Sequence, residues 1–333
     1  MSMIFIIFAL MVIKADLANK CRILGIEGGG IRTIYDIGAF SALADYMDPE
    51  EIKYDIMNGE SPGAVAIGIL GFFKNGDEKK AASFLTDIIV NLQLNQTFKS
   101  WPGGIPQGLL FEEGIFDDSP LLDTLKSYQK VAGGVLQRNC SLGVTYIDTV
   151  DFVVSLGKIN SSNAALWSVK SSTVEGLFPP VHEDGHFIVD GGTQYLIELA
   201  SAISFCSNLG YKDSDIIIDL LLNLMENMTA INVTNSSSMG MLSRAKYLIS
   251  REKTSHYLYT ILNSYPKVDW RYIAIPSKVL PVNYFNTFPI GFTRKNVNET
   301  LALGYQDMKN LIIGNTSHAA LEKLKKQISH RFI

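Results

Sequence analysis

The order of apolar segments along this 333-residue chain constrains its fold more than any other feature. From Arg22 onward, short apolar runs such as RILGI alternate with longer segments of helical period such as IYDIGAFSALADYM. This alternation is typical of βα units, in which helices cover both faces of a mostly parallel sheet. The segment PGAVAIGILGFF is apolar on all sides, which indicates a helix buried within that arrangement. The sequence therefore predicts an α/β fold, a three-layer sandwich around a central sheet.

Later segments supply further elements. Four apolar runs are predicted to be strands, and the last is dense enough in apolar residues to be central: LGVTYI, DFVVSL, FIVDGG and DIIIDLLL. We expect helices over 242–262 and from Leu301 onward, and a polar loop from Met225 to Met241. Because both helical segments can pack on the same core, residues 21–333 are interpreted as a single domain.

Residues 1–20 are predicted to be a signal peptide. An apolar run from Met3 to Ile13 is followed by Lys14 and small residues, and it is too short to span a bilayer. It lacks a basic n-region and a good cleavage pattern, so a buried first strand or an uncleaved anchor stays open as an alternative.

Asparagine sequons point in the same direction. Eight asparagines open an N-x-S/T pattern without an intervening proline, against roughly three that chance would give. These candidate glycosylation sites are Asn95, Asn139, Asn160, Asn227, Asn232, Asn235, Asn298 and Asn315. We therefore predict a secreted or endomembrane-lumenal glycoprotein in preference to a cytoplasmic or membrane-anchored protein, although sequence drift in an asparagine-rich chain stays open.

Charge and cysteine content exclude other classes. A net charge of −4 and the absence of long Lys/Arg runs outside the C-terminal helical segment argue against nucleic-acid binding. Cys21, Cys140 and Cys206 allow at most one internal disulfide. No two cysteines have metal-ligand spacing and the five histidines form no cluster, so no metal is expected.

The segment YDIMNGESPGAVAIGIL contains the pattern G-x-S-x-G, formed by Gly59, Ser61 and Gly63. It follows a strand-like run and opens a helix, as a nucleophile elbow does. Small neighbours allow the tight turn that exposes such a serine. Pro62 fits the first position of the helix, where its missing N–H is not needed. A simple helix N-cap explains Ser61 and Pro62 equally well.

Two further glycine clusters surround this motif in the sequence. Gly28, Gly29 and Gly30 lie between a strand and a helix, with Arg32 at the helix start, and their N–H groups can converge on an anion. A dinucleotide-binding loop is disfavoured because the G-x-G-x-x-G spacing is missing.

Asp190 ends a strand and is followed by Gly191 and Gly192. A carboxylate at such a position can approach a serine hydroxyl closely, although an isolated D-G-G is most often a turn.

In this order the three clusters resemble the patatin-like phospholipase family. The matching motifs are Gly28-Gly29-Gly30-Ile31-Arg32, Gly59-Glu60-Ser61-Pro62-Gly63 and Asp190-Gly191-Gly192. The segments GIFDDSPLLDTL, GVTYIDT and SSTVEGLFPPVHEDGHFIVDGG are also similar, so the resemblance runs from about Cys21 to about Leu220.

The resemblance implies a Ser-Asp dyad in which Ser61 is the nucleophile and Asp190 the general base. The loop from Gly28 to Arg32 would form the oxyanion hole. The implied reaction is hydrolysis of phospholipid or other lipid acyl esters through an acyl-enzyme, with no cofactor and with transient contact to a membrane surface. The segment from Trp101 to Phe116 is a candidate interfacial lip, and an ordinary surface loop is its alternative. The oligomeric state stays open.

Two positions depart from the family pattern and leave alternatives. Thr33 stands where the family usually has glycine, and Pro62 removes one backbone donor of an oxyanion hole, which can cost about 100- to 1,000-fold in rate. The alternative is therefore a catalytically weak or inactive patatin-like protein that binds or stores lipid.

A Ser-His-Asp esterase is a further alternative, and its histidine would come after the acid in the chain. The candidates are His256, His318 and His330. His182 and His186 are expected to line a loop.

Overall fold

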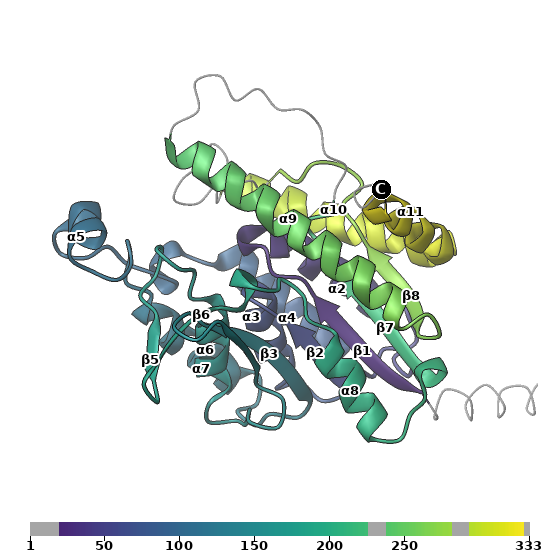
Figure 1. Ribbon diagram of the computed structural model, residues 1–333. Helices are drawn as coiled ribbons and strands as arrows, with labels where there is room; N and C mark the ends of the chain where they lie inside the picture. The colour runs from purple at the N-terminus through teal and green to yellow at the C-terminus, as the bar shows by residue number, and fades with distance from the viewer. Residues whose placement is uncertain (1–19, 226–237, 282–292, 330–333) are drawn as a thin grey trace, which may run out of the picture.

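The computed structural model describes residues 20–225, 238–281 and 293–329. An eight-stranded sheet runs through the molecule with helices on both sides (Figure 1). Its strands are β1 (Cys21–Ile26), β2 (Ile56–Gly59), β3 (Asn139–Tyr146), β4 (Asp151–Val154), β5 (Val181–Glu183), β6 (His186–Asp190), β7 (Ile216–Leu221) and β8 (Asp269–Ala274). Their order is β5-β6-β3-β2-β1-β7-β8, and β4 pairs with β3 outside this path. The predicted α/β sandwich is confirmed.

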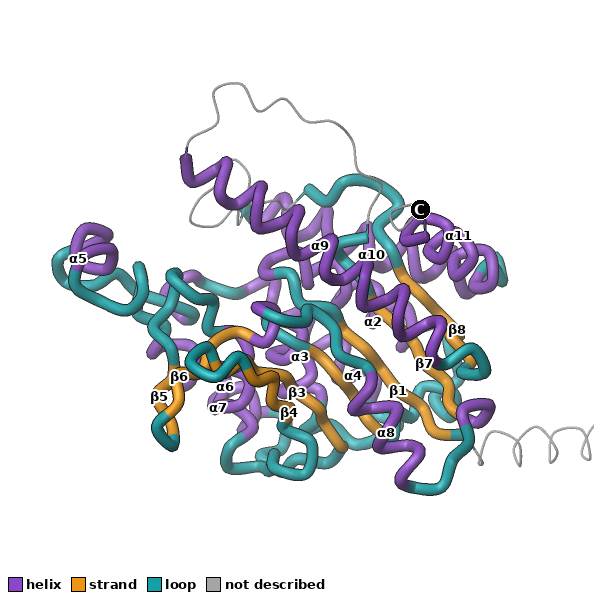
Figure 2. Tube along the Cα trace, viewed as in Figure 1, coloured by secondary structure: helices purple, strands orange, loops and turns teal. Residues whose placement is uncertain are grey.

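The sheet, whose strands are orange in Figure 2, has a parallel and an antiparallel part. Strands β3, β2, β1, β7 and β8 are parallel, as βα units require. β4 and β6 run antiparallel to β3, and β5 runs antiparallel to β6. β5 and β6 form a hairpin whose two-residue turn is Asp184-Gly185, both at positive φ.

The described helices form the two outer layers, except α5, which projects from the body of the molecule (Figure 1). They are α2 (Ile34–Tyr46), α3 (Pro62–Leu70), α4 (Glu78–Asn91), α5 (Gly104–Leu110), α6 (Ser119–Val131), α7 (Ala164–Ser172), α8 (Ala200–Asn208), α9 (Ser238–Ser264), α10 (Arg294–Ile313) and α11 (Ser317–Ser329). Short 3-10 turns are η1 (Gly30–Thr33), η2 (Leu94–Gln96), η3 (Gly191–Thr193) and η4 (Asp213–Asp215). Residues of α2, α3, α4, α6, α7 and α10 share one core, and residues of α8, α9 and α11 share the other.

Strand β7 contributes side chains to both cores. Ile216, Ile218 and Leu220 belong to the core under α8, α9 and α11, whereas Leu221 belongs to the opposite core. This is the period of two expected of a strand buried on both faces. β7 lies between β1 and β8, which agrees with its predicted internal position.

The cysteines occupy different places in this scheme. Cys21 of β1 and Cys206 of α8 form a disulfide that ties α8 to the sheet across 185 positions of sequence. Cys140 is buried and free.

Two predicted boundaries are wrong. The C-terminal helix is two helices, α10 and α11, and α10 begins at Arg294, before Leu301. The break follows Gly314, where Asn315 adopts φ +47° and leaves the helical conformation. The polar loop does not extend to Met241, because α9 already begins at Ser238.

Five of the eight sequon asparagines lie in described segments, and their side chains are all exposed: Asn95, Asn139, Asn160, Asn298 and Asn315. Asn227, Asn232 and Asn235 lie outside the described residues, as do residues 1–19 of the predicted signal peptide. Among the helices that the structure describes, none combines the length and the apolar character needed to cross a membrane.

Candidate active site

Ser61 occupies a tight turn between β2 and α3. Its φ of 56° and ψ of −134° lie in a region that non-glycine residues rarely adopt, at a cost of about 1–3 kcal/mol. The turn also requires both flanking glycines. A Cβ on Gly59 would lie 2.8 Å from the backbone of Gly63, and a Cβ on Gly63 would lie 2.4 Å from the carbonyl oxygen of Ile26. This is the strained strand-turn-helix geometry of a nucleophile elbow, and it is not that of an ordinary N-cap.

Asp190 is the hydrogen-bond partner of this serine. The Oγ of Ser61 donates to Oδ2 of Asp190 at 2.5 Å. The other carboxylate oxygen accepts from the N–H of Gly192 at 2.6 Å, and the N–H of Asp190 donates to the carbonyl of Thr173 at 2.8 Å. Ser61 and Asp190 are each only 4% exposed. The carboxylate is therefore fixed in orientation and shielded from water.

Strand register explains how the two residues meet. Gly59 at the end of β2 pairs with Leu142 of β3, and Val144, two residues further along β3, pairs with Asp190 of β6. Ser61 follows Gly59 by two residues. Although β2 and β6 lie on opposite sides of β3, the side chains of Ser61 and Asp190 therefore meet beyond the end of β2. Gly191 allows the close approach, because a Cβ there would lie 2.3 Å from the carbonyl oxygen of Gly143.

The electrostatic environment suits a base. Burial raises the pKa of Asp190 to about 7 from its ordinary 3.8, although the hydrogen bonds from Ser61 and Gly192 oppose this rise. The neighbouring Glu60 is fully buried, and burial holds its pKa well above the ordinary value. Burial thus favours the neutral form of the Glu60 carboxyl beside Asp190.

The glycine loop after β1 lies against the serine, since a Cβ on Gly28 would lie 3.0 Å from the Cβ of Ser61. Not every residue of the predicted oxyanion loop, Gly28 to Arg32, has an available N–H group, however. The N–H of Gly28 donates to the carbonyl of Leu196 at 2.7 Å, and the N–H of Arg32 donates to the carbonyl of Gly29 at 3.2 Å.

Gly29 and Gly30 carry candidate donors in this loop. The N–H groups of Gly29 and Gly30 have no acceptor among the residues that the structure describes. Both residues, like Ile31, are partly exposed. Thr33 is accommodated because its hydroxyl donates to the carbonyl of Glu27 at 3.3 Å.

Pro62 takes the first position of α3, as predicted. The N–H of Ser61 itself donates to Oγ of Ser171 at 3.0 Å. Neither Ser61 nor Pro62 therefore offers an available backbone N–H, and Gly29 and Gly30 are the candidate donors for an oxyanion.

The structure reveals two contributors that the sequence did not single out. Ser171 holds the elbow, and Asn223, directly after β7, contacts the glycine loop: its Nδ2 lies 3.1 Å from the carbonyl oxygen of Glu27. In the sequence no motif distinguishes Ser171 from the other serines around it. Asn223 could not be placed beside the glycine loop, because the sequence does not show that the strand before it, β7, lies next to β1.

The histidines in the described segments form no hydrogen bond with Ser61 or Asp190. His256 on α9 and His318 on α11 are exposed, and His330 lies outside the described residues. His182 and His186 lie on strands β5 and β6 and not in a loop, and they contact Glu113 and Asp148 at 2.7 Å and 2.9 Å. The hydroxyl of Ser61 instead donates directly to a carboxylate.

Helix α9 borders the site. Lys246 on α9 pairs with Glu175 at 2.9 Å, and Glu175 also accepts from the hydroxyl of Thr193, three residues after Asp190. Both charges act on the Asp190 carboxylate: Glu175 raises its pKa and Lys246 lowers it.

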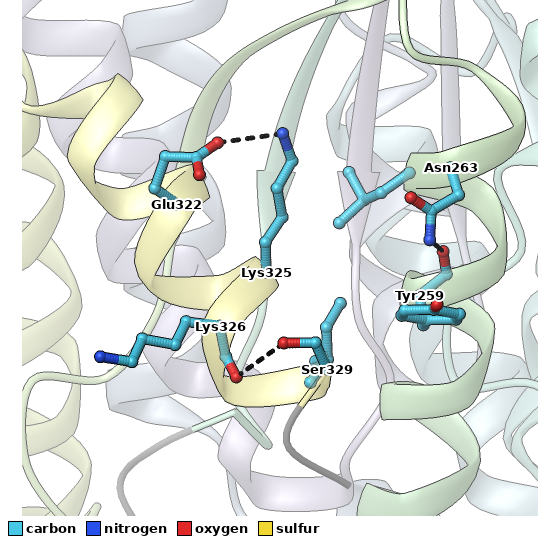
Figure 3. A pocket seen from close by; sticks show the side chains of 8 residues that line it. Tyr259, Asn263, Glu322, Lys325, Lys326 and Ser329 are labelled. Atoms are coloured by element: carbon cyan, nitrogen blue, oxygen red, sulfur yellow. Dashed lines mark hydrogen bonds and ion pairs between the residues drawn. The ribbon is translucent and has the colours of Figure 1, made fainter. Parts of the chain in front are cut away.

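A surface pocket of about 460 Å³ lies between α9 and α11 (Figure 3). Lys325 pairs there with Glu322 at 3.0 Å, and the hydroxyl of Ser329 donates to the carbonyl of Lys326. Its lining is Tyr259, Leu262, Asn263, Glu322, Lys325, Lys326, Ile328 and Ser329. The pocket shares no residue with the Ser61–Asp190 site. Within the described ranges, no three His, Cys, Asp or Glu side chains gather as metal ligands would.

A family model and two solved structures are similar to this chain. The family model described as patatin-like phospholipase matches residues 24–203, more than half of the chain. VipD from Legionella pneumophila is 13% identical, with a TM-score of 0.41 over 89% of this chain and 67% of VipD. The type III effector protein ExoU is also 13% identical, with a TM-score of 0.35 over 89% of this chain and 53% of ExoU. This chain thus spans about two thirds and about half of those proteins. No curated protein sequence matches it.

Proposed function

This chain belongs to the patatin-like phospholipase family, and from that premise we propose that it hydrolyses fatty-acyl esters of phospholipids or related lipids through an acyl-enzyme on Ser61. The observation that carries the proposal is the 2.5 Å hydrogen bond from the Ser61 hydroxyl to Asp190, placed in a strained elbow. A nucleophile beside a base in this geometry is what acyl transfer requires.

The proposed reaction runs in two steps. Asp190 accepts the proton of Ser61 as Oγ attacks the ester carbonyl carbon, and the resulting oxyanion accepts hydrogen bonds from the N–H groups of Gly29 and Gly30. The intermediate expels the alcohol, which takes the proton from Asp190. Water then gives a proton to Asp190 and attacks the acyl-enzyme. The second intermediate expels Oγ of Ser61, which takes that proton back from Asp190, and the fatty acid is released.

A carboxylate with an ordinary pKa is a weak base for an alcohol. Burial reduces this mismatch, because it raises the pKa of Asp190 to about 7. The intact donors of Gly29 and Gly30 support hydrolysis over the alternative of an inactive lipid-binding scaffold, in which Pro62 would have removed an essential donor.

We further propose that the protein makes transient contact with a membrane surface through α5. This helix projects from the body of the molecule (Figure 1). Its end carries consecutive exposed apolar side chains, with Leu109 61%, Leu110 72% and Phe111 81% exposed. The neighbouring charges are acidic, namely Glu112 and Glu113, so apolar insertion and not attraction to anionic lipid would drive the contact.

Three features support a secreted or lumenal location. The Cys21–Cys206 disulfide is typical of proteins from oxidising compartments. The five described sequon asparagines are exposed, and the N-terminal apolar run has the length of a signal-peptide core.

Fatty-acid release from phosphatidylcholine tests the central proposal. The unmodified chain is expected to release fatty acid, and Ser61→Ala and Asp190→Ala are expected to lose at least about 1,000-fold in kcat. Ser329→Ala is a matched serine control in the pocket between α9 and α11 and is expected to retain activity. Equal activity of the folded Ser61→Ala variant would overturn the proposal.

A further inference from the structure

Asn223 lies at the back of the glycine loop. It comes two residues after the end of β7, the parallel neighbour of β1, and Leu221 of β7 pairs with Ile26 of β1. The carboxyl ends of these strands therefore lie side by side, so Asn223 reaches the loop that follows β1. The Asn223 side chain is completely buried.

The amide nitrogen of Asn223 faces three acceptors. Its Nδ2 is 2.6 Å from Oδ2 of Asp36, 3.1 Å from the carbonyl oxygen of Glu27 and 3.4 Å from that of Gly28. Three acceptors around one nitrogen fix the orientation of the amide. The side chain thus links the loop to α2, the helix that follows it.

The backbone of Asn223 makes further ties to the same loop. Its carbonyl oxygen accepts from Nη2 of Arg32 at 2.8 Å and from Nε at 3.2 Å. Its N–H donates to Oε2 of the fully buried Glu27 at 2.7 Å. Asn223 is therefore bonded to residues on both sides of Gly29 and Gly30.

Gly29 is also fitted to this side chain. A Cβ on Gly29 would lie 2.2 Å from Oδ1 of Asn223, a distance that no real contact permits. The backbone of Gly29 accordingly lies directly against the amide of Asn223, at the position where we place an oxyanion donor.

We propose that Asn223 is a positioning residue that holds the N–H groups of Gly29 and Gly30 toward the ester bound at Ser61. This inference rests on the proposed function. Asn223 touches no reacting atom in this account, and it acts by fixing the loop whose donors meet the oxyanion. Because Pro62 supplies no donor, the rate depends on the geometry of these two groups.

The test replaces the amide by a carboxylate of the same shape. Asn223→Asp removes the donor that faces Asp36, Glu27 and Gly28. The matched control is Gln129→Glu, which makes the same chemical change at a buried amide whose Nε2 donates to the carbonyl of Gly68, away from the glycine loop. Asn223→Ser is the second variant, because it is uncharged and too short to reach all three acceptors.

Two readouts separate positioning from general stability. Hydrogen exchange of the peptide covering 27–33 reports on the bonded N–H groups of Gly28 and Arg32, and it is expected to be about 10-fold faster in both Asn223 variants but not in Gln129→Glu. In phosphatidylcholine hydrolysis, kcat is expected to fall about 10- to 1,000-fold with KM within about threefold.

The outcomes distinguish this inference from the proposed function. If the unmodified chain hydrolyses no ester but the loop exchanges faster in the Asn223 variants, the proposed function fails while the hold of Asn223 on the loop stands. If the chain is active and a folded Asn223 variant keeps both its kcat and its loop exchange, the inference is overturned. A loss of kcat of equal size in Gln129→Glu would also overturn it.

Discussion

The hydroxyl of Ser61 and the carboxylate of Asp190 are hydrogen-bonded at 2.5 Å although 129 residues separate them in the sequence. Ser61 follows β2, which pairs with β3 in parallel, and Asp190 ends β6, which pairs with β3 antiparallel. The two side chains therefore meet at one buried point. The serine of the elbow thus has a carboxylate directly beside it, without an intervening histidine.

The pH dependence of activity should report on Asp190. The base form is the carboxylate and burial raises its pKa to about 7, so kcat/KM is expected to rise about tenfold per pH unit below 7 and to level off above it. Measurement with a neutral soluble ester from pH 5 to 9 gives the profile. A midpoint near pH 4 would show that the base is an ordinary exposed carboxylate.

Replacing Pro62 tests whether the missing donor limits the enzyme. Pro62→Ala restores an N–H at the start of α3, and kcat is expected to change by less than about 10-fold because Gly29 and Gly30 already supply donors. Pro120→Ala, at the start of α6, is the matched control for the loss of a helix-start proline. A gain of about 100-fold or more at Pro62 alone would mean that the natural chain is a weakened scaffold.

The disulfide should contribute to stability. Removing Cys21–Cys206 by the double change Cys21→Ala/Cys206→Ala is expected to lower the free energy of unfolding by about 2–5 kcal/mol, because the bond closes a long loop in the unfolded chain. Denaturant unfolding with and without reductant measures this. The unfolding midpoint of Cys140→Ala should still fall when reductant is added, whereas that of the double variant should not change. The reverse pattern would contradict the assigned pairing.

The tip after α5 should govern binding to lipid. Leu110→Asp/Phe111→Asp is expected to weaken sedimentation with phosphatidylcholine vesicles by about 100-fold, because two large apolar side chains lose their burial in the interface. Hydrolysis of a soluble ester should not change. The matched control is Val131→Asp/Val150→Asp, whose residues are similarly exposed, at 70% and 74%. Equal loss in both double variants would refute a specific role for α5.

The sequence predicted the parts of this site that depend on local pattern. The apolar alternation indicated the sandwich, and G-x-S-x-G and D-G-G identified the two residues that the structure brings together. Pro62 could be placed at the first position of a helix because that position does not need its N–H.

What the sequence could not predict depends on which strands are neighbours. The contact of Asn223 with the glycine loop requires β7 beside β1, and the pairing of Cys21 requires α8 to cover that strand. The prediction from sequence counted the N–H groups of Gly28 and Arg32 among the oxyanion donors. In the structure, both groups already donate to backbone carbonyl oxygens, which a sequence does not reveal. One of these, Leu196, is distant in sequence and carries no motif.

The most direct test of the account is to locate the acyl group on the enzyme. The full chain is mixed with a slowly hydrolysed 4-nitrophenyl fatty-acid ester, quenched in acid during the steady state, digested and analysed by mass spectrometry. The account predicts an acyl mass on the peptide that contains Ser61, and its absence in the Ser61→Ala variant. Turnover of the ester with an acyl group on another residue, or with the same mass in Ser61→Ala, would contradict it.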